Sequence, residues 1–146
     1  MNCQDVMTPA PVCCVPDDAV VDVARLMRAQ DIGAIPVVAD RDSQRLIGMV
    51  TDRDLAVRVV AEGRDARETV VRDVMSMQPV VCLVSDLYQQ ALQAMGEHQV
   101  RRIPVVDEQG RLVGIIAQAD VATRLAQPST TGAIVEAISE PAASLR

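Results

Sequence analysis

The sequence predicts a mixed α/β (α+β) protein made of two tandem β-α-β-β-α repeats. One part of the chain recurs at a fixed spacing, and inside each copy the apolar residues alternate between helical and strand periodicity. The composition is that of a folded protein, because 49% of the 146 residues are hydrophobic, but only 1% are aromatic. A core of this chain must therefore be packed from aliphatic side chains.

The repeat is recognised from short motifs that occur twice in the chain. Asp5-Val6-Met7-Thr8 recurs as Asp73-Val74-Met75-Ser76, an offset of 73 − 5 = 68, and Ile35-Pro36-Val37-Val38 recurs as Ile103-Pro104-Val105-Val106 at the same offset. Further along, Leu46-Ile47-Gly48-Met49-Val50 matches Leu112-Val113-Gly114-Ile115-Ile116 at 112 − 46 = 66, because the intervening polar turn is two residues longer in the first copy. Polar turns tolerate such insertions.

Each repeat is expected to begin with a short strand, around Cys14 in the first copy and Cys82 in the second. A helix follows, with apolar residues at i, i+3, i+4 and i+7: Val20, Val23, Ala24 and Met27, then Tyr88, Ala91, Leu92 and Met95. Candidate helix caps precede it at Asp17 or Asp18, and at Ser85 or Asp86.

Runs rich in Val and Ile predict one β-hairpin per repeat, over residues 34–39 with 45–51 and residues 102–107 with 111–117. A second helix follows each hairpin, with apolar stripes at Leu55, Ala56, Val59 and Val60, and at Val121, Ala122, Leu125 and Ala126. Residues 127–132 are typical of a helix breaker, and residues 133–138 predict a short terminal helix.

These elements divide the chain into residues 1–68, residues 69–127 and a tail of residues 128–146. A unit of about 60 residues is marginally stable alone, so the two repeats are expected to pack on each other about a pseudo-twofold axis. The apolar second helices predict a homodimer. A stripe buried between the repeats would, however, look the same in sequence.

Charge and composition exclude several classes of function. The 14 Lys and Arg residues against 20 Asp and Glu residues give a net charge of −6, which disfavours nucleic acid and anionic membranes as partners. No apolar run approaches the ~18 residues that span a bilayer, and no secretion signal is recognisable, so we expect a cytoplasmic protein. Four cysteines without CxxC spacing and a single histidine predict no zinc site.

A polar corner lies where the first hairpin turns into its second helix. Thr51 and Asp54 stand at this helix start, where free backbone N–H groups and the helix dipole favour a phosphate, and a carboxylate can accept both hydroxyls of a ribose. The alternative is structural, since Thr-x-x-Asp is nearly a capping box. From spacing alone both interpretations stay open.

The motifs together resemble the CBS-domain pair, the tandem cystathionine-β-synthase-type module, across residues 5–127. The resemblance rests on the repeated openings, the Ile-Pro-Val-Val strands, and the run from Gly48 to Asp54 with its partial copy from Gly114 to Asp120. The chain is also similar to small stand-alone bacterial CBS-pair proteins of the hypoxic-response type. The family implies a non-catalytic sensor that binds AMP, ADP, ATP, NAD or S-adenosylmethionine between the repeats, with no required cofactor and an effector protein that the sequence does not identify.

The resemblance also implies two ligand sites. The first comprises Thr51, Arg53, Asp54, Pro79, Val80, Val81, Cys82, Val100, Arg101, Arg102, Ile103 and Pro104. The second, weaker site comprises Val12, Cys13, Gly33, Ala34, Pro36, Ala117 and Asp120. Only the first has a corner hydroxyl and arginines for a phosphate. The competing interpretation of the two neighbouring arginines is that they make ordinary surface ion pairs.

Two other classes of function are weighed against the sensor. In a ligand-free protein–protein interaction module, Thr51 and Asp54 would only cap a helix. An enzyme would need a base and a nucleophile, for which His98 and a cysteine are the candidates, but no carboxylate orients such a pair. We therefore expect no catalysis.

Overall fold

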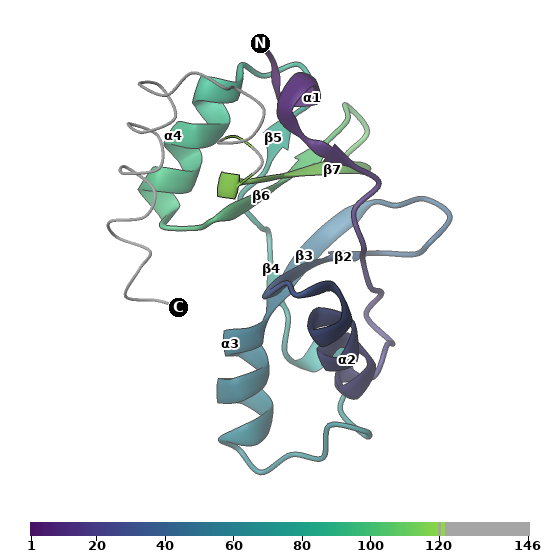
Figure 1. The fold of residues 1–146 in the computed structure, drawn as a ribbon. Helices are drawn as coiled ribbons and strands as arrows, with labels where there is room; N and C mark the ends of the chain where they lie inside the picture. The colour runs from purple at the N-terminus through teal and green to yellow at the C-terminus, as the bar shows by residue number, and fades with distance from the viewer. Residues whose placement is uncertain (120, 122–146) are drawn as a thin grey trace. The chain divides into compact units, whose positions relative to one another are not determined.

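The computed structural model describes residues 1–119 and Val121, and it divides into two compact units. The central unit is Val12–Pro79, and the terminal unit combines Met1–Pro11 with the described residues that follow Pro79 (Figure 1). The chain passes from one unit to the other before Val12 and before Val80, in each case 11 residues after the predicted start of a repeat, since 12 − 1 = 11 and 80 − 69 = 11. The predicted boundaries at residues 68 and 127 describe the repeats in sequence and stay predictions.

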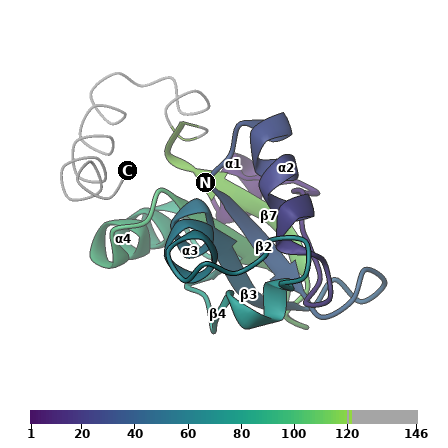
Figure 2. The same cartoon turned by 90° about the horizontal axis from the view of Figure 1, so that it is seen from below.

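The central unit packs two helices on a three-stranded antiparallel sheet of order β2-β3-β4. Its elements are α2 (Val20–Gln30), β2 (Ala34–Val38), β3 (Leu46–Thr51), α3 (Asp52–Leu55), a π-helix (Ala56–Val60), a 3₁₀ turn (Val71–Asp73) and β4 (Ser76–Met77). The first helix contacts β2 and the second contacts β3. Figure 2 shows α3 nearly along its axis, with α2 beside it.

The terminal unit has a four-stranded sheet of order β1-β7-β6-β5. Its elements are α1 (Cys3–Val6), β1 (Thr8–Pro9), β5 (Cys82–Leu83), α4 (Tyr88–His98), β6 (Arg102–Val106) and β7 (Leu112–Ala117). The strand β5 runs parallel to β6, whereas the other neighbours are antiparallel. Within the described part of the chain, no helix has the length and apolar character needed to cross a membrane.

The opening motif of each sequence repeat belongs to the sheet of the other repeat's hairpin. In the terminal unit β1 pairs with β7, and in the central unit β4 pairs with β3. We call residues 1–11 and 69–79 the exchanged segments. Each contributes two fully buried residues to the core it joins, Cys3 and Val6 in one unit and Val71 and Val74 in the other. The repeats in sequence are therefore not the units of packing.

The predicted helices 20–27 and 88–95 and both predicted hairpins are confirmed, with small changes at their ends. The first strand of each repeat is shorter than expected: Cys14 makes one isolated parallel bridge to Val37, and β5 has two residues. The predicted helix caps, Asp17 or Asp18 and Ser85 or Asp86, are wrong, since the N-caps are Ala19 and Leu87. Asp18 and Asp86 each accept a hydrogen bond from a backbone N–H three residues before them, at 3.0 and 2.9 Å, and so close the preceding turn.

The second helix of the first repeat changes its winding after one turn. Ala61 N–H donates to the Ala56 carbonyl at 2.9 Å, an i to i+5 bond that widens the turn. Val59 is buried at 3% exposure, whereas Val60 is 76% exposed. Ala56 is exposed as well, so the predicted apolar stripe is wrong at Ala56 and Val60. Of the predicted second helix at 121–126 only Val121 is described, and the predicted helix at 133–138 lies outside the described residues.

Candidate functional site

The polar corner of the central unit is formed where β3 ends and α3 begins. Thr51 has an extended backbone and is the N-cap of α3. The hairpin register places Ala34 opposite Thr51, and the Gly33 carbonyl accepts a hydrogen bond from the Asp52 N–H at 2.9 Å. The start of β2 therefore lies beside the corner within the same unit.

Thr51 and Asp54 bond to each other reciprocally. The Asp54 N–H donates to Thr51 Oγ1 at 3.1 Å, and the Thr51 N–H donates to Asp54 Oδ2 at 2.9 Å. Both residues are half-buried. From the described part of the chain, Asp54 Oδ1 receives no hydrogen bond, and the Thr51 hydroxyl keeps its proton to donate. The corner is thus a complete capping box that retains hydrogen-bonding capacity.

The matching corner of the terminal unit is different in chemistry. Ala117 ends β7 where Thr51 ends β3, and Arg102 lies opposite it in the hairpin register. The Gln118 N–H donates to the Arg101 carbonyl at 3.0 Å, as Asp52 does to Gly33 in the other unit. Within this unit, both arginines therefore adjoin the corner that lacks the hydroxyl. Asp120, predicted for the same corner, lies outside the described residues.

The three arginines predicted for phosphate binding make no ion pair with the described residues. Arg53 is exposed, while Arg101 and Arg102 are half-buried. The recorded ion pairs belong to other arginines: Arg25, Arg41, Arg64, Arg72 and Arg111. The Nε of Arg101 is buried, and no acceptor in the described part of the chain reaches it. A buried donor of this kind requires an explanation.

The residues predicted to form the wall of the first site differ in how deeply they are buried. Val80 and Val100 are partly buried against the core of the terminal unit, Val81 is 41% exposed, and Pro79 is half-buried at the end of the central unit. The remaining wall residues are buried: Cys82, Ile103 and Pro104. Because the first two of these have side chains in the core, they can offer a ligand only their backbone.

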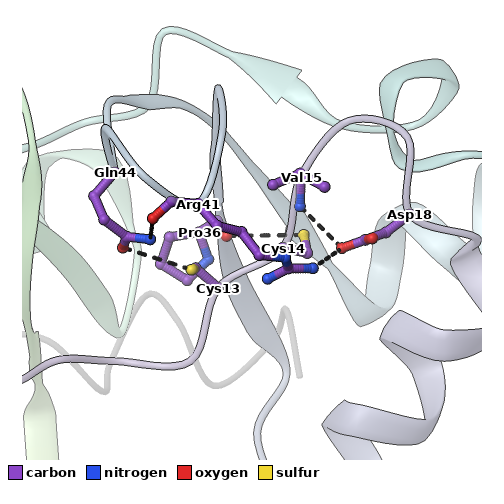
Figure 3. A network of polar contacts seen from close by, with 7 residues as sticks. All are labelled: Cys13, Cys14, Val15, Asp18, Pro36, Arg41 and Gln44. Atoms are coloured by element: carbon purple, nitrogen blue, oxygen red, sulfur yellow. Dashed lines mark hydrogen bonds and ion pairs between the residues drawn. The ribbon is translucent and has the colours of Figure 1, made fainter.

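One residue of the wall predicted for the second site, Cys13, is bonded to the long turn of the central hairpin (Figure 3). The Cys13 thiol donates to Gln44 Oε1 at 3.7 Å, and Arg41 pairs with Asp18 at 3.0 Å. Val12, Cys13 and Ala34 are half-buried, whereas Gly33 and Pro36 are buried. The longer turn of the first repeat thus contacts the predicted wall through Gln44 and Cys13.

The candidate histidine and three of the cysteines differ in their burial. His98 is exposed at the end of α4. Burial raises the pKa of the Cys14 thiol to about 12, and burial also raises the pKa of Cys3 and Cys82, which keeps these thiols protonated near neutral pH. Among the described residues, no three His, Cys, Asp or Glu side chains gather where they could hold a metal ion.

Two stretches of the chain match the family model of the CBS domain, residues 3–61 and residues 71–127. The chain belongs to the CBS-domain family. The two matches make it a CBS pair, as the sequence motifs predicted, and they follow the sequence repeats rather than the compact units. The exchanged segments explain the difference. The strand β1 belongs to the first repeat but pairs with β7 of the second, and β4 belongs to the second repeat but pairs with β3 of the first.

The CBS pair is similar to proteins of known structure. Hypoxic response protein 1 of Mycobacterium tuberculosis is 36% identical over 140 residues, which cover 96% of this chain and 95% of that protein. A crystal structure of Hypoxic Response Protein I with two coordinated zinc ions matches at TM-score 0.76 and 35% identity, covering 84% of this chain and 98% of that chain. CBSX2 of Arabidopsis thaliana in complex with AMP matches at TM-score 0.74 and 28% identity, covering 88% and 98%.

One feature of the site was not predicted from the sequence. Gly33 and Ala34 were assigned only to the second site, yet they lie beside Thr51 in the central unit. The signal was present in the hairpin, because pairing the two apolar runs around their polar turn places the first residue of β2 opposite the last residue of β3. Among the described residues, no group of three His, Cys, Asp or Glu side chains corresponds to a zinc site of the kind named for Hypoxic Response Protein I.

Proposed function

We propose that this CBS pair is a non-catalytic regulatory sensor that binds an adenosine-containing ligand of the AMP, ADP or ATP class, with NAD and S-adenosylmethionine as further candidates. The observation that carries the proposal is the Thr51–Asp54 corner, whose half-buried carboxylate keeps one oxygen without a hydrogen bond from the described residues. The similarity to CBSX2, a protein solved with AMP, supports this class of ligand.

The corner provides two kinds of contact that a nucleotide requires. Asp54 Oδ1 can accept a ribose hydroxyl while Oδ2 continues to accept from the Thr51 N–H. The Thr51 hydroxyl can donate to a phosphate oxygen while its Oγ1 accepts from the Asp54 N–H. Because the capping box already holds both side chains in place, binding would cost little further ordering of these residues.

The state of Arg101 supports an anionic group on the ligand. Its Nε is buried without an acceptor among the described residues, and a buried donor left unsatisfied costs about 1–3 kcal/mol. A phosphate oxygen near Arg101 would remove this cost and would add a charge-assisted hydrogen bond. The prediction that Arg102 serves the same ligand as Asp54 stays a prediction.

Calorimetry with AMP, ADP, ATP, NAD and S-adenosylmethionine tests the proposal directly. Asp54→Asn keeps a carbonyl that can accept from the Thr51 N–H but removes the charge, so it should preserve the fold and weaken the best ligand about ten-fold or more. Asp52→Asn is the matched control, because it removes an exposed carboxylate two residues away on the same helix. Equal losses in the two variants would count against the proposed role of Asp54.

The complete capping box also favours a second candidate, a ligand-free interaction module. In that case Thr51 and Asp54 act only on the start of α3, and loss of an N-cap costs about 0.5–2 kcal/mol of stability. A ligand at 100 times its dissociation constant should stabilise a true sensor by about 2.7 kcal/mol. Thermal unfolding with and without each ligand separates the two candidates, since the module should show no shift.

We further propose that the protein is a homodimer that acts on a separate effector protein in the cytoplasm. Val57 and Val60 are exposed on the π-helix at 46% and 76%, so this helix presents apolar surface. Val60→Asp should lower the mass measured by light scattering from about twice 15.7 kDa to 15.7 kDa without changing stability. Val59 is unsuitable for this test, because it lies in the core and Val59→Asp would unfold the unit.

A further inference from the structure

Two buried thiols face each other in the core of the terminal unit. Cys3 lies in α1 of the N-terminal exchanged segment and is 0% exposed, and Cys82 lies in β5 and is 4% exposed. Both belong to the same buried cluster, and their side chains are close enough to share a hydrogen bond. The two cysteines are 79 positions apart in the chain, since 82 − 3 = 79.

The backbone fixes both sides of this pair. The Cys3 N–H donates to the Asp86 carbonyl at 2.8 Å, and the Gln4 N–H donates to the Val84 carbonyl at 3.2 Å. On the other side, the Cys82 thiol donates to the Pro104 carbonyl at 3.8 Å. The exchanged segment is thereby bonded to the chain that directly follows β5, the strand that contains Cys82.

The central unit contains the same arrangement without the second sulfur. The residues equivalent to Cys3 and Cys82 at an offset of 68 are Val71 and Cys14, both buried. The Val71 N–H donates to the Asp18 carbonyl at 2.9 Å, and the Cys14 thiol donates to the Pro36 carbonyl at 3.8 Å. A valine therefore fills the equivalent core position, so packing alone does not require a thiol at Cys3. The Cys3 thiol can, in addition, be oxidised.

We propose that Cys3 and Cys82 form an oxidisable dithiol, which closes to a disulfide on reaction with a peroxide and so locks the N-terminal exchanged segment onto β5. One thiolate attacks an oxygen of hydrogen peroxide, so an S–O bond forms, the O–O bond breaks and hydroxide leaves. The second thiolate attacks the sulfenic sulfur, so the S–S bond forms and hydroxide leaves again. Two thiols lose two electrons and two protons, and one peroxide becomes two waters.

Local opening of the exchanged segment sets the rate of this reaction. Both thiols are buried, and burial raises the pKa of each, so little thiolate exists while the segment is closed. The segment is held by a four-residue helix, a two-residue strand and a few backbone hydrogen bonds. Such an element opens more readily than the sheet of the unit, and opening exposes Cys3 to the oxidant.

The test uses the full chain with Cys13→Ser, because Cys13 is half-buried and the other three cysteines are buried. After treatment with hydrogen peroxide, denaturation and alkylation, Cys14 should be alkylated while Cys3 and Cys82 are recovered as one linked peptide. The intact mass should fall by two hydrogen atoms. Thermal unfolding should shift upward by several degrees, and dithiothreitol should reverse the shift, because the bond closes a long loop in the unfolded chain.

Cys3→Val is the matched control, since it reproduces the Val71–Cys14 pair of the other unit and should fold normally but show neither the mass change nor the shift. In the opposite direction, Val71→Cys should create a second oxidisable pair with Cys14, reported by a second loss of two hydrogen atoms. The proposal is overturned if Cys3 and Cys82 are both alkylated after oxidation. It is equally overturned if the upward shift persists in Cys3→Val.

Discussion

Asp107 organises the turn between β6 and β7 through three accepted hydrogen bonds. Its Oδ1 accepts from the Gln109 and Arg111 N–H groups at 3.0 and 2.9 Å, and its Oδ2 accepts from Arg111 Nε at 3.0 Å. These bonds, led by the Arg111 N–H, lower the pKa of Asp107 below its ordinary value of 3.8. Folding therefore favours the ionised carboxylate.

The pH dependence of stability follows from that direction. Because the folded pKa is lowered, the contribution of Asp107 is complete above the unfolded value near 3.8 and is lost as the pH falls through the folded pKa. Asp107→Asn should therefore reduce the loss of stability on acidification, measured by urea unfolding at a series of pH values from neutral to below about pH 4. Glu108→Gln, an exposed neighbour, is the control. The same acid dependence in both variants would show that Asp107 has no special role.

At the scale of elements, two glycines allow the exchanged strands to approach the hairpins. A Cβ on Gly48 would lie 2.6 Å from the backbone carbonyl oxygen of Ser76 in β4, whereas a Cβ on Gly114 would meet the flexible side chain of Met7. Backbone in a sheet cannot move aside as a methionine side chain can. The two glycines therefore have equivalent positions but unequal tolerance.

Gly48→Ala should destabilise the protein by about 1–3 kcal/mol, as overpacking does, and Gly114→Ala should cost clearly less. Gly96→Ala is the contrasting control, because Gly96 is in α4 and its Cβ would meet nothing within 4 Å among the described residues. That substitution should stabilise the helix by up to about 1 kcal/mol. Denaturant unfolding measures all three. A larger loss for Gly114→Ala than for Gly48→Ala would contradict the assigned packing.

The predictability of each element follows from what its residues encode locally. Helices α2 and α4 and both hairpins carry a strong apolar period over many residues, and all were predicted from the sequence. Strands β1 and β4 have two residues each, which is too short for any period. Their partners are also set by contacts far apart in sequence, so the exchange of segments could not be predicted.

The same distinction applies to the site. Thr51 and Asp54 were predicted from local spacing, and the structure confirms their place at the start of α3. The outward turn of Val60 could not be predicted, since a helical period of 3.6 was assumed and the chain winds as a π-helix. Likewise, the sequence does not show which oxygen of Asp54 accepts from the Thr51 N–H and which one receives no hydrogen bond from the described residues. Such details come from tertiary geometry.

At the scale of the whole molecule, the exchange determines which fragments can fold. A fragment of residues 12–79 contains the complete central unit, including β4 and the buried Val71 and Val74. A fragment of residues 1–68 is equally long, since 79 − 12 + 1 = 68, but it lacks those residues and carries β1 without β7. Chains of this size have little stability to lose.

We therefore expect the 12–79 fragment to unfold cooperatively on heating and the 1–68 fragment to show no cooperative transition. Circular dichroism against temperature measures this, and the dispersion of amide proton resonances provides an independent readout. The identical length removes chain length as an explanation for a difference. Equal cooperativity in the two fragments would mean that the exchanged segments contribute little to the stability of the units.

The differences between the two repeats predict that their ligand sites have unequal affinity for a nucleotide. Thr51 and Asp54 form one corner, while its counterpart has Ala117 in place of the hydroxyl and is adjoined by Arg101 and Arg102 within its unit. Loss of one hydrogen bond to a charged oxygen costs about 1.5–3 kcal/mol, which corresponds to a ten-fold to more than hundred-fold difference in affinity. The two corners thus share a backbone arrangement but differ in the polar side chains that they carry.

Calorimetry with AMP or ATP should accordingly give one tight site per chain. Arg102→Ala should abolish it, because the family resemblance predicts that this guanidinium contacts the ligand's phosphate, and Ala117→Thr should strengthen the second site by restoring a corner hydroxyl. Because the two arginines lie beside Ala117 within the terminal unit, the same experiment also tests whether the tight site is instead at the Ala117 corner. If tight binding survives Arg102→Ala but is lost in Asp120→Ala, the competent corner is that of the terminal unit, and two equal sites per chain would contradict the asymmetry itself.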